Sequence, residues 1–158
     1  MVFGAWVVFL ALVAWLFQGE LERQFNPNSE PVVNVAESGE QEVVLRRNRS
    51  GHYVATGEVN GESVRFLVDT GATDVAMSEA TGRRLGLRPG APVTLSTANG
   101  LVRGARTTID SIAIGPIRLE DVAAVLSPGI DESIVLLGMS FLRDLELVQR
   151  DGQLILRR

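Results

Sequence analysis

The sequence has no cysteine, no lysine and only one histidine, His52, among its 158 residues. Without cysteine the chain has no disulfide framework, no thiol nucleophile and no cysteine-ligated zinc or iron–sulfur site. Without lysine it has no Walker A phosphate loop and no Schiff-base catalyst. A single histidine cannot supply a multi-histidine metal site, so we expect neither a metal nor a cofactor. The net charge of −4 argues against a nucleic-acid partner, because sequence-independent binding depends on neutralising phosphates.

Charge is also missing from residues 1–17, since all 15 arginines and all 19 acidic residues follow them. This apolar run is at the short end of the length needed to span a membrane. Trp6 and Trp15 lie near its two ends, where tryptophan suits a membrane interface. We therefore predict a single-pass transmembrane anchor at residues 1–17. One alternative is a cleaved secretory signal, although no basic start or small-residue cleavage site is visible. The other is a buried helix of a globular core.

Residues 18–41 have few large apolar side chains, and they contain proline, glycine, asparagine and serine. Such a segment cannot bury enough surface to offset the entropy lost on ordering it. We therefore predict a flexible linker at residues 18–41. Its first residues include Glu20, Glu22 and Arg23, which form no basic cluster that would retain this flank in the cytoplasm. This favours export of the part of the chain that follows.

From residue 42 to residue 158, short apolar runs alternate with turn residues, which predicts one all-β domain. The runs at residues 53–59 and 64–68 flank Asn60-Gly61, a strong hairpin signal because both residues tolerate positive φ in a type I′ turn. One short helix should follow Ser78 as its N-cap and stop near Gly86, and another should cover about residues 140–144. Many short strands with close turns indicate a small barrel or sandwich. Further strands are predicted at residues 93–97, 101–108, 111–114, 117–119, 123–126, 134–137, 145–149 and 153–156.

The first predicted hairpin leads directly into an acidic loop. Asp69 follows three large apolar residues, 66–68, so its carboxylate should lie at the edge of the core. Thr70 can hydrogen-bond backbone groups and fix the turn, and Gly71 permits close backbone approach. Taken alone, Asp-Thr-Gly can equally be an ordinary turn at the end of a strand, because the tripeptide is common by chance.

Other polar residues receive plainer interpretations. Asp74 is expected to cap the loop or to form an ion pair, and not to act as a second catalytic acid. His52 is expected at the surface, and a Ser–His–acid triad would have to use it, but the sequence has no Gly-x-Ser-x-Gly elbow. Arg46, Arg47 and Arg49 are expected at a solvated strand edge.

Three motifs, in this order along the chain, resemble those of the retropepsin-like aspartic proteases. The first is Asp69-Thr70-Gly71-Ala72, preceded by Phe-Leu-Val, which resembles their active-site loop. Residues 93–103 follow in the position of the flap that covers substrate, with Thr97, Ala98, Asn99 and Gly100 at the tip. Residues 134–138 then resemble the hydrophobic-hydrophobic-glycine element that packs beside the loop, here Leu136, Leu137 and Gly138. The sequence looks closest to the bacterial membrane-anchored members, in which a transmembrane helix precedes the domain.

The resemblance implies a small closed barrel-like acid-protease fold and an aspartic endopeptidase that acts on peptides or proteins. Such hydrolysis uses two carboxylates about one water, but the chain has a single Asp-Thr-Gly and no room for a second lobe. We therefore expect a homodimer in which Asp69 is supplied twice; the resemblance also implies that Thr70 hydrogen-bonds across the interface. It further implies a bacterial inner-membrane location with the domain outside the cytoplasm. The alternative is a noncatalytic, membrane-tethered interaction module with the same fold.

Overall fold

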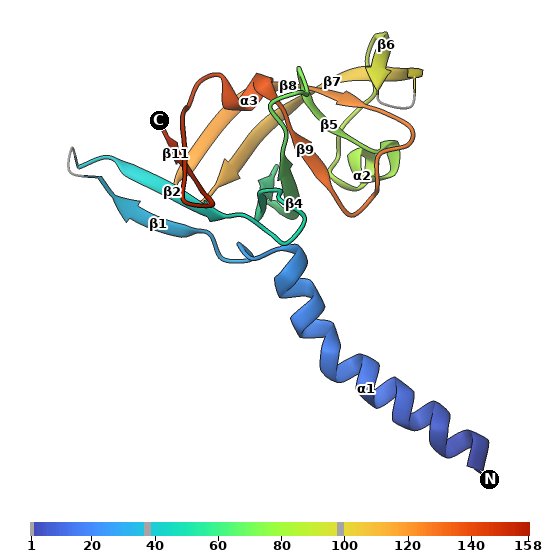
Figure 1. Cartoon of the computed structure of the whole chain (residues 1–158). Helices are drawn as coiled ribbons and strands as arrows, with labels where there is room; N and C mark the ends of the chain where they lie inside the picture. Colours follow the sequence, from blue (N-terminus) through green and yellow to red (C-terminus); the bar gives the residue numbers. More distant parts are fainter. Residues whose placement is uncertain (1, 37–38, 98–99) are drawn as a thin grey trace.

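Strands make up most of the domain, and three helices accompany them in the described part of the chain (Figure 1). The computed structural model describes residues 2–36, 39–97 and 100–158. The helices are α1 (Val2–Phe25), α2 (Glu79–Arg84) and α3 (Met139–Leu142). The strands are β1 (Val32–Val35), β2 (Gln41–Arg46), β3 (Val54–Val59), β4 (Glu62–Val68), β5 (Val75–Met77), β6 (Pro92–Thr97), β7 (Gly100–Ile114), β8 (Ile117–Leu126), β9 (Val135–Leu137), β10 (Glu146–Arg150) and β11 (Gln153–Arg157). The predicted mostly-β fold is therefore confirmed.

The larger sheet closes on itself. Its strand order is β3-β4-β9-β5-β8-β7-β6, and β3 also pairs with β7, where Val59 lies opposite Ile112. Side chains alternate between the inside and the outside of this sheet, as the two-residue period of a strand requires. In β8, for example, Ile117 and Leu119 are buried while Arg118 is exposed. The inward side chains, together with Phe66 of β4 and Phe141 of α3, form one hydrophobic core.

Local turn signals are reproduced in the structure, whereas strand lengths are not. Asn60 and Gly61 have φ of 52° and 81°, as the predicted type I′ turn requires. At the start of α2, the Thr81 N–H donates to the Ser78 hydroxyl at 3.0 Å, so the predicted N-cap is present. The strands predicted at 101–108 and 111–114 are one strand, β7, and those at 117–119 and 123–126 are one strand, β8. The polar residues that suggested a break, Asp110, Glu120 and Asp121, are exposed, and β7 and β8 pair on both sides of Asp110 and Asp121.

A second sheet, of order β1-β2-β11-β10, contains both ends of the domain. The predicted C-terminal strand pair is present as β10 and β11. Strands β2 and β11 are also joined by an ion pair in which Arg157 Nε lies 2.8 Å from Glu42 Oε2. Glu42 is buried, and this hydrogen bond is the main reason that the pKa of Arg157 is raised.

Helix α1 projects away from the two sheets (Figure 1). Its apolar side chains face outward, with Trp6 and Trp15 60% and 70% exposed, so the alternative of a buried core helix is wrong. Among the described residues, no helix combines the length and the apolar character that crossing a membrane requires. The predicted transmembrane anchor at residues 1–17 is therefore not supported.

The segment predicted as a flexible linker, residues 18–41, has regular secondary structure and contacts with the domain among its described residues. It contains the last two turns of α1, the strand β1, and Asn28, which is buried. The Asn28 amide donates to the carbonyls of Arg46 (2.9 Å) and Val54 (2.6 Å), and its oxygen accepts from the Arg46 N–H at 2.6 Å. One amide side chain thus joins β2 to β3. Its hydrogen bonds hold the segment to the domain, although the segment has few apolar side chains to bury.

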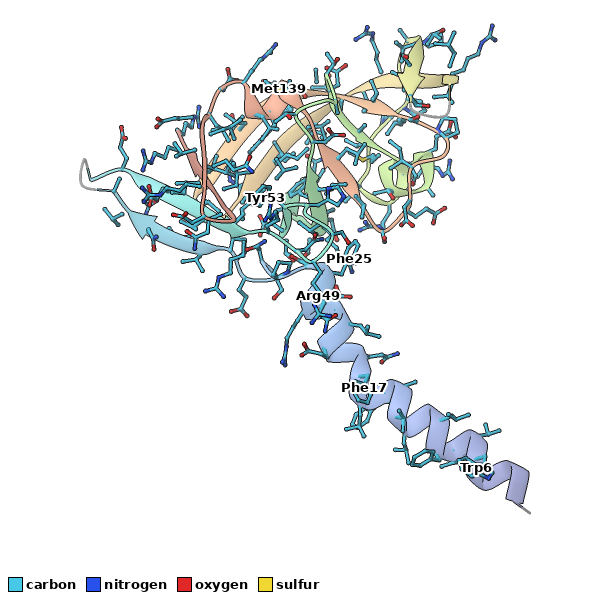
Figure 2. All side chains as sticks on the ribbon, viewed as in Figure 1. Trp6, Phe17, Phe25, Arg49, Tyr53 and Met139 are labelled. Atoms are coloured by element: carbon cyan, nitrogen blue, oxygen red, sulfur yellow. The ribbon has the colours of Figure 1, made fainter. Side chains whose placement is uncertain are left out.

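The end of α1 is also attached to the domain. Arg65 of β4 lies 3.0 Å from the Glu22 carboxylate, and its guanidinium stacks 5.3 Å from the centre of the Phe25 ring. Arg49 donates to Gln24 at 3.0 Å, and Figure 2 shows Phe25 and Arg49 at this junction. The polar contacts and the cation–π contact together fix where the helix leaves the domain.

Candidate active site

Asp69 lies where β4 ends, at the junction with β9. Strands β4 and β9 run parallel, with Val68 opposite Leu137. The Asp69 N–H continues this pairing by donating to the Leu137 carbonyl at 3.1 Å. The Asp69 side chain is half-buried at the edge of the core, as its position after three apolar residues predicted.

The residues after Asp69 form a tight turn around its carboxylate. Asp69 Oδ1 accepts the Gly71 N–H at 2.9 Å, and the Asp69 carbonyl accepts the Ala72 N–H at 3.2 Å. A Cβ atom on Gly71 would lie 3.2 Å from Asp69 Oδ1, so glycine keeps this approach open. Thr70 is exposed, so its side chain is available to a partner. The turn therefore holds one carboxylate oxygen in place by a backbone donor.

Gly138, the last residue of the hydrophobic-hydrophobic-glycine element at residues 136–138, contacts this turn. A Cβ atom at position 138 would lie 2.2 Å from the Asp74 carbonyl oxygen and 2.8 Å from that of Ala72. Directly after Gly138, the first N–H groups of α3 donate to the turn: Met139 N–H to Ala72 (2.8 Å) and Ser140 N–H to Thr73 (2.9 Å). Helix N-termini leave such donors unpaired within the helix, and here the candidate active-site loop accepts them.

The predicted flap is a hairpin of β6 and β7. Thr97 pairs with Gly100, and the Thr97 hydroxyl donates to the Gly100 carbonyl at 2.8 Å. Gly100 has φ of 107°, which favours glycine. Leu101 is 75% exposed beside the tip. Ala98 and Asn99, which were predicted at the tip, lie outside the described residues.

Three of the other sequence interpretations can be compared with the structure. His52 is exposed, as predicted. Asp74 was expected to cap the loop or form an ion pair; within the described ranges its half-buried carboxylate shows no such contact, so the role of that side chain stays a prediction. It is the backbone of Asp74 that matters, through its close approach to Gly138. Of the arginines at 46, 47 and 49, Arg49 contacts α1 and is more than a solvated edge.

The loop that leads into β9 is held by its own hydrogen bonds. Asp131 accepts both the hydroxyl and the N–H of Ser133, and these two bonds lower the pKa of the Asp131 carboxyl. The Thr81 hydroxyl of α2 donates to the Glu132 carbonyl at 2.8 Å. These hydrogen bonds fix the start of β9, the strand that leads into Gly138.

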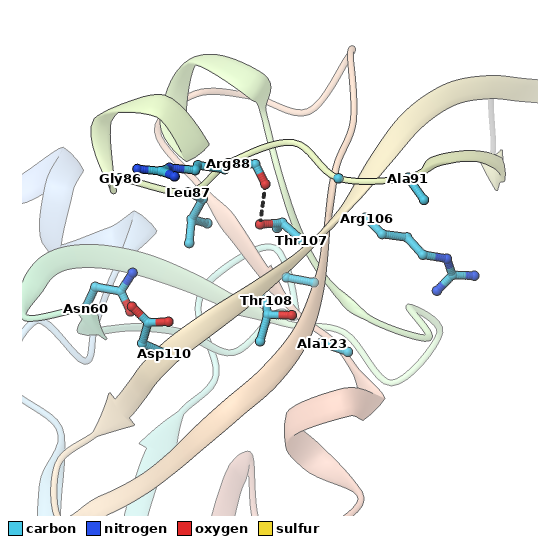
Figure 3. Close-up of a pocket in the computed structure, with 12 residues that line it drawn as sticks. Asn60, Gly86, Leu87, Arg88, Ala91, Arg106, Thr107, Thr108, Asp110 and Ala123 are labelled. Carbon is cyan, nitrogen blue, oxygen red and sulfur yellow. Dashed lines mark hydrogen bonds between the residues drawn. The ribbon is translucent and has the colours of Figure 1, made fainter.

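A cavity of about 620 Å³ lies apart from the Asp69 loop, between the segment after α2 and strands β7 and β8 (Figure 3). Its lining residues are Asn60, 86–88, 90–91, 106–108, Asp110, Ala123 and Ala124, and none of them belongs to residues 69–75. The Thr107 hydroxyl of β7 donates to the Arg88 carbonyl at 2.9 Å, a bond between two of the lining residues (Figure 3). Within the described ranges, no three acidic or histidine side chains are grouped to hold a metal ion.

One chain therefore presents one carboxylate, with one oxygen held by the Gly71 N–H, a close contact of its loop with Gly138, and a hairpin in the position of a flap. Sequence reasoning missed one residue of this arrangement, Ser140, which is buried beside the loop. In the sequence, Ser140 could have been noticed only as a small polar residue two positions after Gly138.

The chain is similar to several known proteins. Residues 55–144 match the family model described as "gag-polyprotein putative aspartyl protease". An uncharacterized protein from the cobV 5′ region of a Sinorhizobium species is 38% identical over 95% of this chain and 69% of its own length. The uncharacterized protein RP867 of Rickettsia prowazekii is 30% identical over 73% of this chain and half of its own length.

Two solved structures are also similar. The crystal structure of a retropepsin-like aspartic protease from Rickettsia conorii has a TM-score of 0.63 and 31% identity, over 81% of this chain and 95% of that one. The EIAV protease complexed with the inhibitor HBY-793 has a TM-score of 0.50 and 20% identity, over 61% of this chain and 90% of that one, and supports the fold alone. With a family model matched over more than half of its residues, the chain belongs to the retropepsin-like aspartic protease family.

Proposed function

We propose that this protein is an aspartic endopeptidase that hydrolyses peptide bonds as a homodimer, with Asp69 as the catalytic residue of each subunit. The observation that carries the proposal is the placement of Asp69: a half-buried carboxylate at a strand end, with one oxygen held by the Gly71 N–H and the loop pressed against Gly138. Membership of the family supports the reaction class.

The homodimer follows from the number of carboxylates. Two carboxylates close together cannot both ionise readily, so the pair shares a proton. The ionised Asp69 takes a proton from a water, the water attacks the scissile carbonyl, and the protonated Asp69 of the partner polarises that carbonyl and later protonates the leaving amine. Since one chain supplies a single Asp-Thr-Gly, a two-fold axis beside Asp69 would supply the second. The β6–β7 hairpin would cover an extended peptide and exclude water.

The test is cleavage of a library of unstructured peptides by the full chain, by Asp69→Asn and by a control, Asp144→Asn. Asp144 is an exposed acid after α3, so its substitution should leave the rate unchanged, whereas Asp69→Asn should abolish cleavage. Cleavage that survives in Asp69→Asn would refute the assignment. A wild-type chain that binds peptides but never cuts them would favour the alternative, a noncatalytic interaction module.

A mixing experiment tests the shared site. If wild-type and Asp69→Asn chains exchange at random in equal amounts, only about half of the wild-type chains find a wild-type partner. The activity per wild-type chain should therefore fall to about half of its unmixed value. An unchanged activity per wild-type chain would show that each chain works alone.

We also propose that the domain is attached to a membrane through residues 1–17 and lies on the extracytoplasmic side, at a bacterial inner membrane. This proposal is supported by the uncharged run and by the outward-facing apolar side chains of α1. Flotation of the full chain with lipid vesicles should be lost in Leu12→Arg. It should persist in Leu21→Arg, which lies in the same helix and is also exposed, but outside the run. Failure of the wild-type chain to float would refute the attachment, and protection of the domain from external protease in spheroplasts would refute the orientation.

A further inference from the structure

Ser140 of α3 has a side chain that joins three elements beside the Asp69 loop. Its hydroxyl oxygen accepts the Val75 N–H at 2.9 Å, and the hydroxyl donates to the Ala123 carbonyl at 2.7 Å. Val75 is the first residue of β5, and it lies opposite Ala124 of β8, so the serine links the two strands where their pairing begins. Ser140 is 8% exposed, and Met139, labelled in Figure 2, marks the place.

The contacts of Ser140 hold the far end of the loop that begins at Asp69. Its N–H binds the Thr73 carbonyl and its hydroxyl binds the Val75 N–H, so the two bonds lie on either side of Asp74. The near end of the loop is held separately, by the bond between the Asp69 N–H and the Leu137 carbonyl. Between these two ends, the loop contacts the start of α3 through Gly138, the Met139 N–H and the Ser140 N–H.

The hydroxyl is difficult to replace because it both donates and accepts in one place. Val75 is fully buried, so its N–H would have no water to bind if the serine oxygen were removed. A buried donor without a partner favours any movement that pairs it elsewhere. Such a movement would shift the backbone that positions the Asp69 carboxylate, and hydrolysis requires that carboxylate within hydrogen-bond reach of the attacking water.

We infer that Ser140 is a positioning residue of the proposed protease: it touches no substrate, and its hydroxyl fixes the loop that carries Asp69. This inference rests on the proposed function for its kinetic consequence, but the ordering of the loop is a property of the folded chain. The two can therefore be measured separately.

The kinetic experiment compares four variants of the full chain on one peptide substrate. Ser140→Ala removes the hydroxyl, Ser140→Cys keeps the size with a weaker hydrogen-bonding group, and Ser140→Thr keeps the hydroxyl. Ser127→Ala is the matched control, because Ser127 is also buried, but among the described residues its hydroxyl reaches only the adjacent Pro128 carbonyl. Since a misplacement of about 1 Å can cost about 100-fold in rate, kcat should fall by about ten-fold or more in the alanine and cysteine variants. The KM should stay within about three-fold, and the threonine variant should recover most of kcat.

Hydrogen exchange of the same variants, followed by mass spectrometry, does not depend on catalysis. The segment at residues 69–77 should exchange about ten-fold faster in the alanine and cysteine variants, with β10 and β11 unchanged and with wild-type exchange in Ser127→Ala. The inference is overturned if 69–77 exchanges as in the wild type, if protection is lost equally across the chain, or if kcat follows side-chain size and not the hydroxyl. If the wild-type chain cuts no peptide, the proposed function fails, and the exchange result still decides whether Ser140 orders the loop. If Ser140→Ala does not fold, the cysteine and threonine variants give the comparison.

Discussion

Replacing Gly138 with alanine should destabilise the domain and abolish peptide cleavage. The added Cβ would lie 2.2 Å from the Asp74 carbonyl oxygen, 2.7 Å from the Asp74 carbonyl carbon and 2.8 Å from the Ala72 carbonyl oxygen. All three neighbours are backbone atoms of the Asp69 loop, so no side chain can rotate away to make room. Either β9 and α3 must move back or the loop must, and the bonds from Met139 and Ser140 to that loop would lengthen.

The magnitude can be estimated from core overpacking. One extra methylene in a packed core costs about 1–3 kcal/mol, and contacts this short with backbone place Gly138→Ala at the upper end, about 3 kcal/mol. Small domains have a total stability of about 5–15 kcal/mol, so the variant should still fold. Its melting temperature should fall by about 10 °C, since about 1 kcal/mol corresponds to several degrees at this size.

The assay is urea unfolding followed by far-ultraviolet circular dichroism. Tryptophan emission is unsuitable, because Trp6 and Trp15 both lie in α1, outside the core. Gly19→Ala is the control, since a Cβ there meets nothing within 4 Å and lies in a helix that alanine favours. A Gly138→Ala variant as stable as Gly19→Ala would refute the reasoning, because it would mean that the loop and the glycine element do not approach as the structure shows. Full activity in a destabilised variant would refute the link to Asp69.

Three further substitutions each change one polar side chain and use the same urea unfolding. Asn28→Ala should lower stability by about 2–4 kcal/mol, because it removes three hydrogen bonds to backbone groups of Arg46 and Val54 that are part-buried or buried; a loss below about 0.5 kcal/mol would show that these bonds do not hold the segment to the domain. Tyr53→Phe should leave stability unchanged or raise it by about 1 kcal/mol, since the buried Tyr53 hydroxyl has no hydrogen-bond partner among the described residues, and a clear loss would reveal a bound water. Ser78→Ala should cost about 1 kcal/mol by removing the N-cap of α2, and an unchanged midpoint would show that the cap is dispensable.

The parts of the fold that the sequence predicted depend on neighbouring residues. The Asn60-Gly61 turn needs two residues that tolerate positive φ, and the cap of α2 needs a hydroxyl three positions before a backbone N–H. The place of Asp69 at a core edge followed from the apolar residues directly before it. In each case, the residues that determine the local structure lie within a few positions of it, so a short sequence pattern is enough to predict it.

The parts that the sequence missed depend on residues far apart in the chain. Asn28 orders a polar segment because its amide matches backbone groups 18 and 26 residues away, and composition alone predicted a linker there. Strand β7 continues past its polar residues because β8 and β3 pair with it, which no local propensity reports. In both places, long-range contacts determined the structure, and the local sequence pattern predicted something else.

The candidate site depends on residues of both kinds, those recognisable from a local pattern and those that act through long-range contacts. Gly138 could therefore be predicted from the sequence, and Ser140 could not. Gly138 forms a recognisable motif because its contact excludes every side chain, so only one residue type fits. Ser140 acts on Val75, 65 positions away, through backbone groups that any sequence provides, so nothing at position 75 indicates the partner. The position of the Asp69 carboxylate depends on both contacts. A sequence with the Asp-Thr-Gly loop and the glycine element but no hydroxyl at position 140 should therefore keep the fold and lose catalytic rate. The two variants separate these effects: Ser140→Ala should lower kcat, whereas Gly138→Ala should lower both the stability of the domain and the cleavage rate.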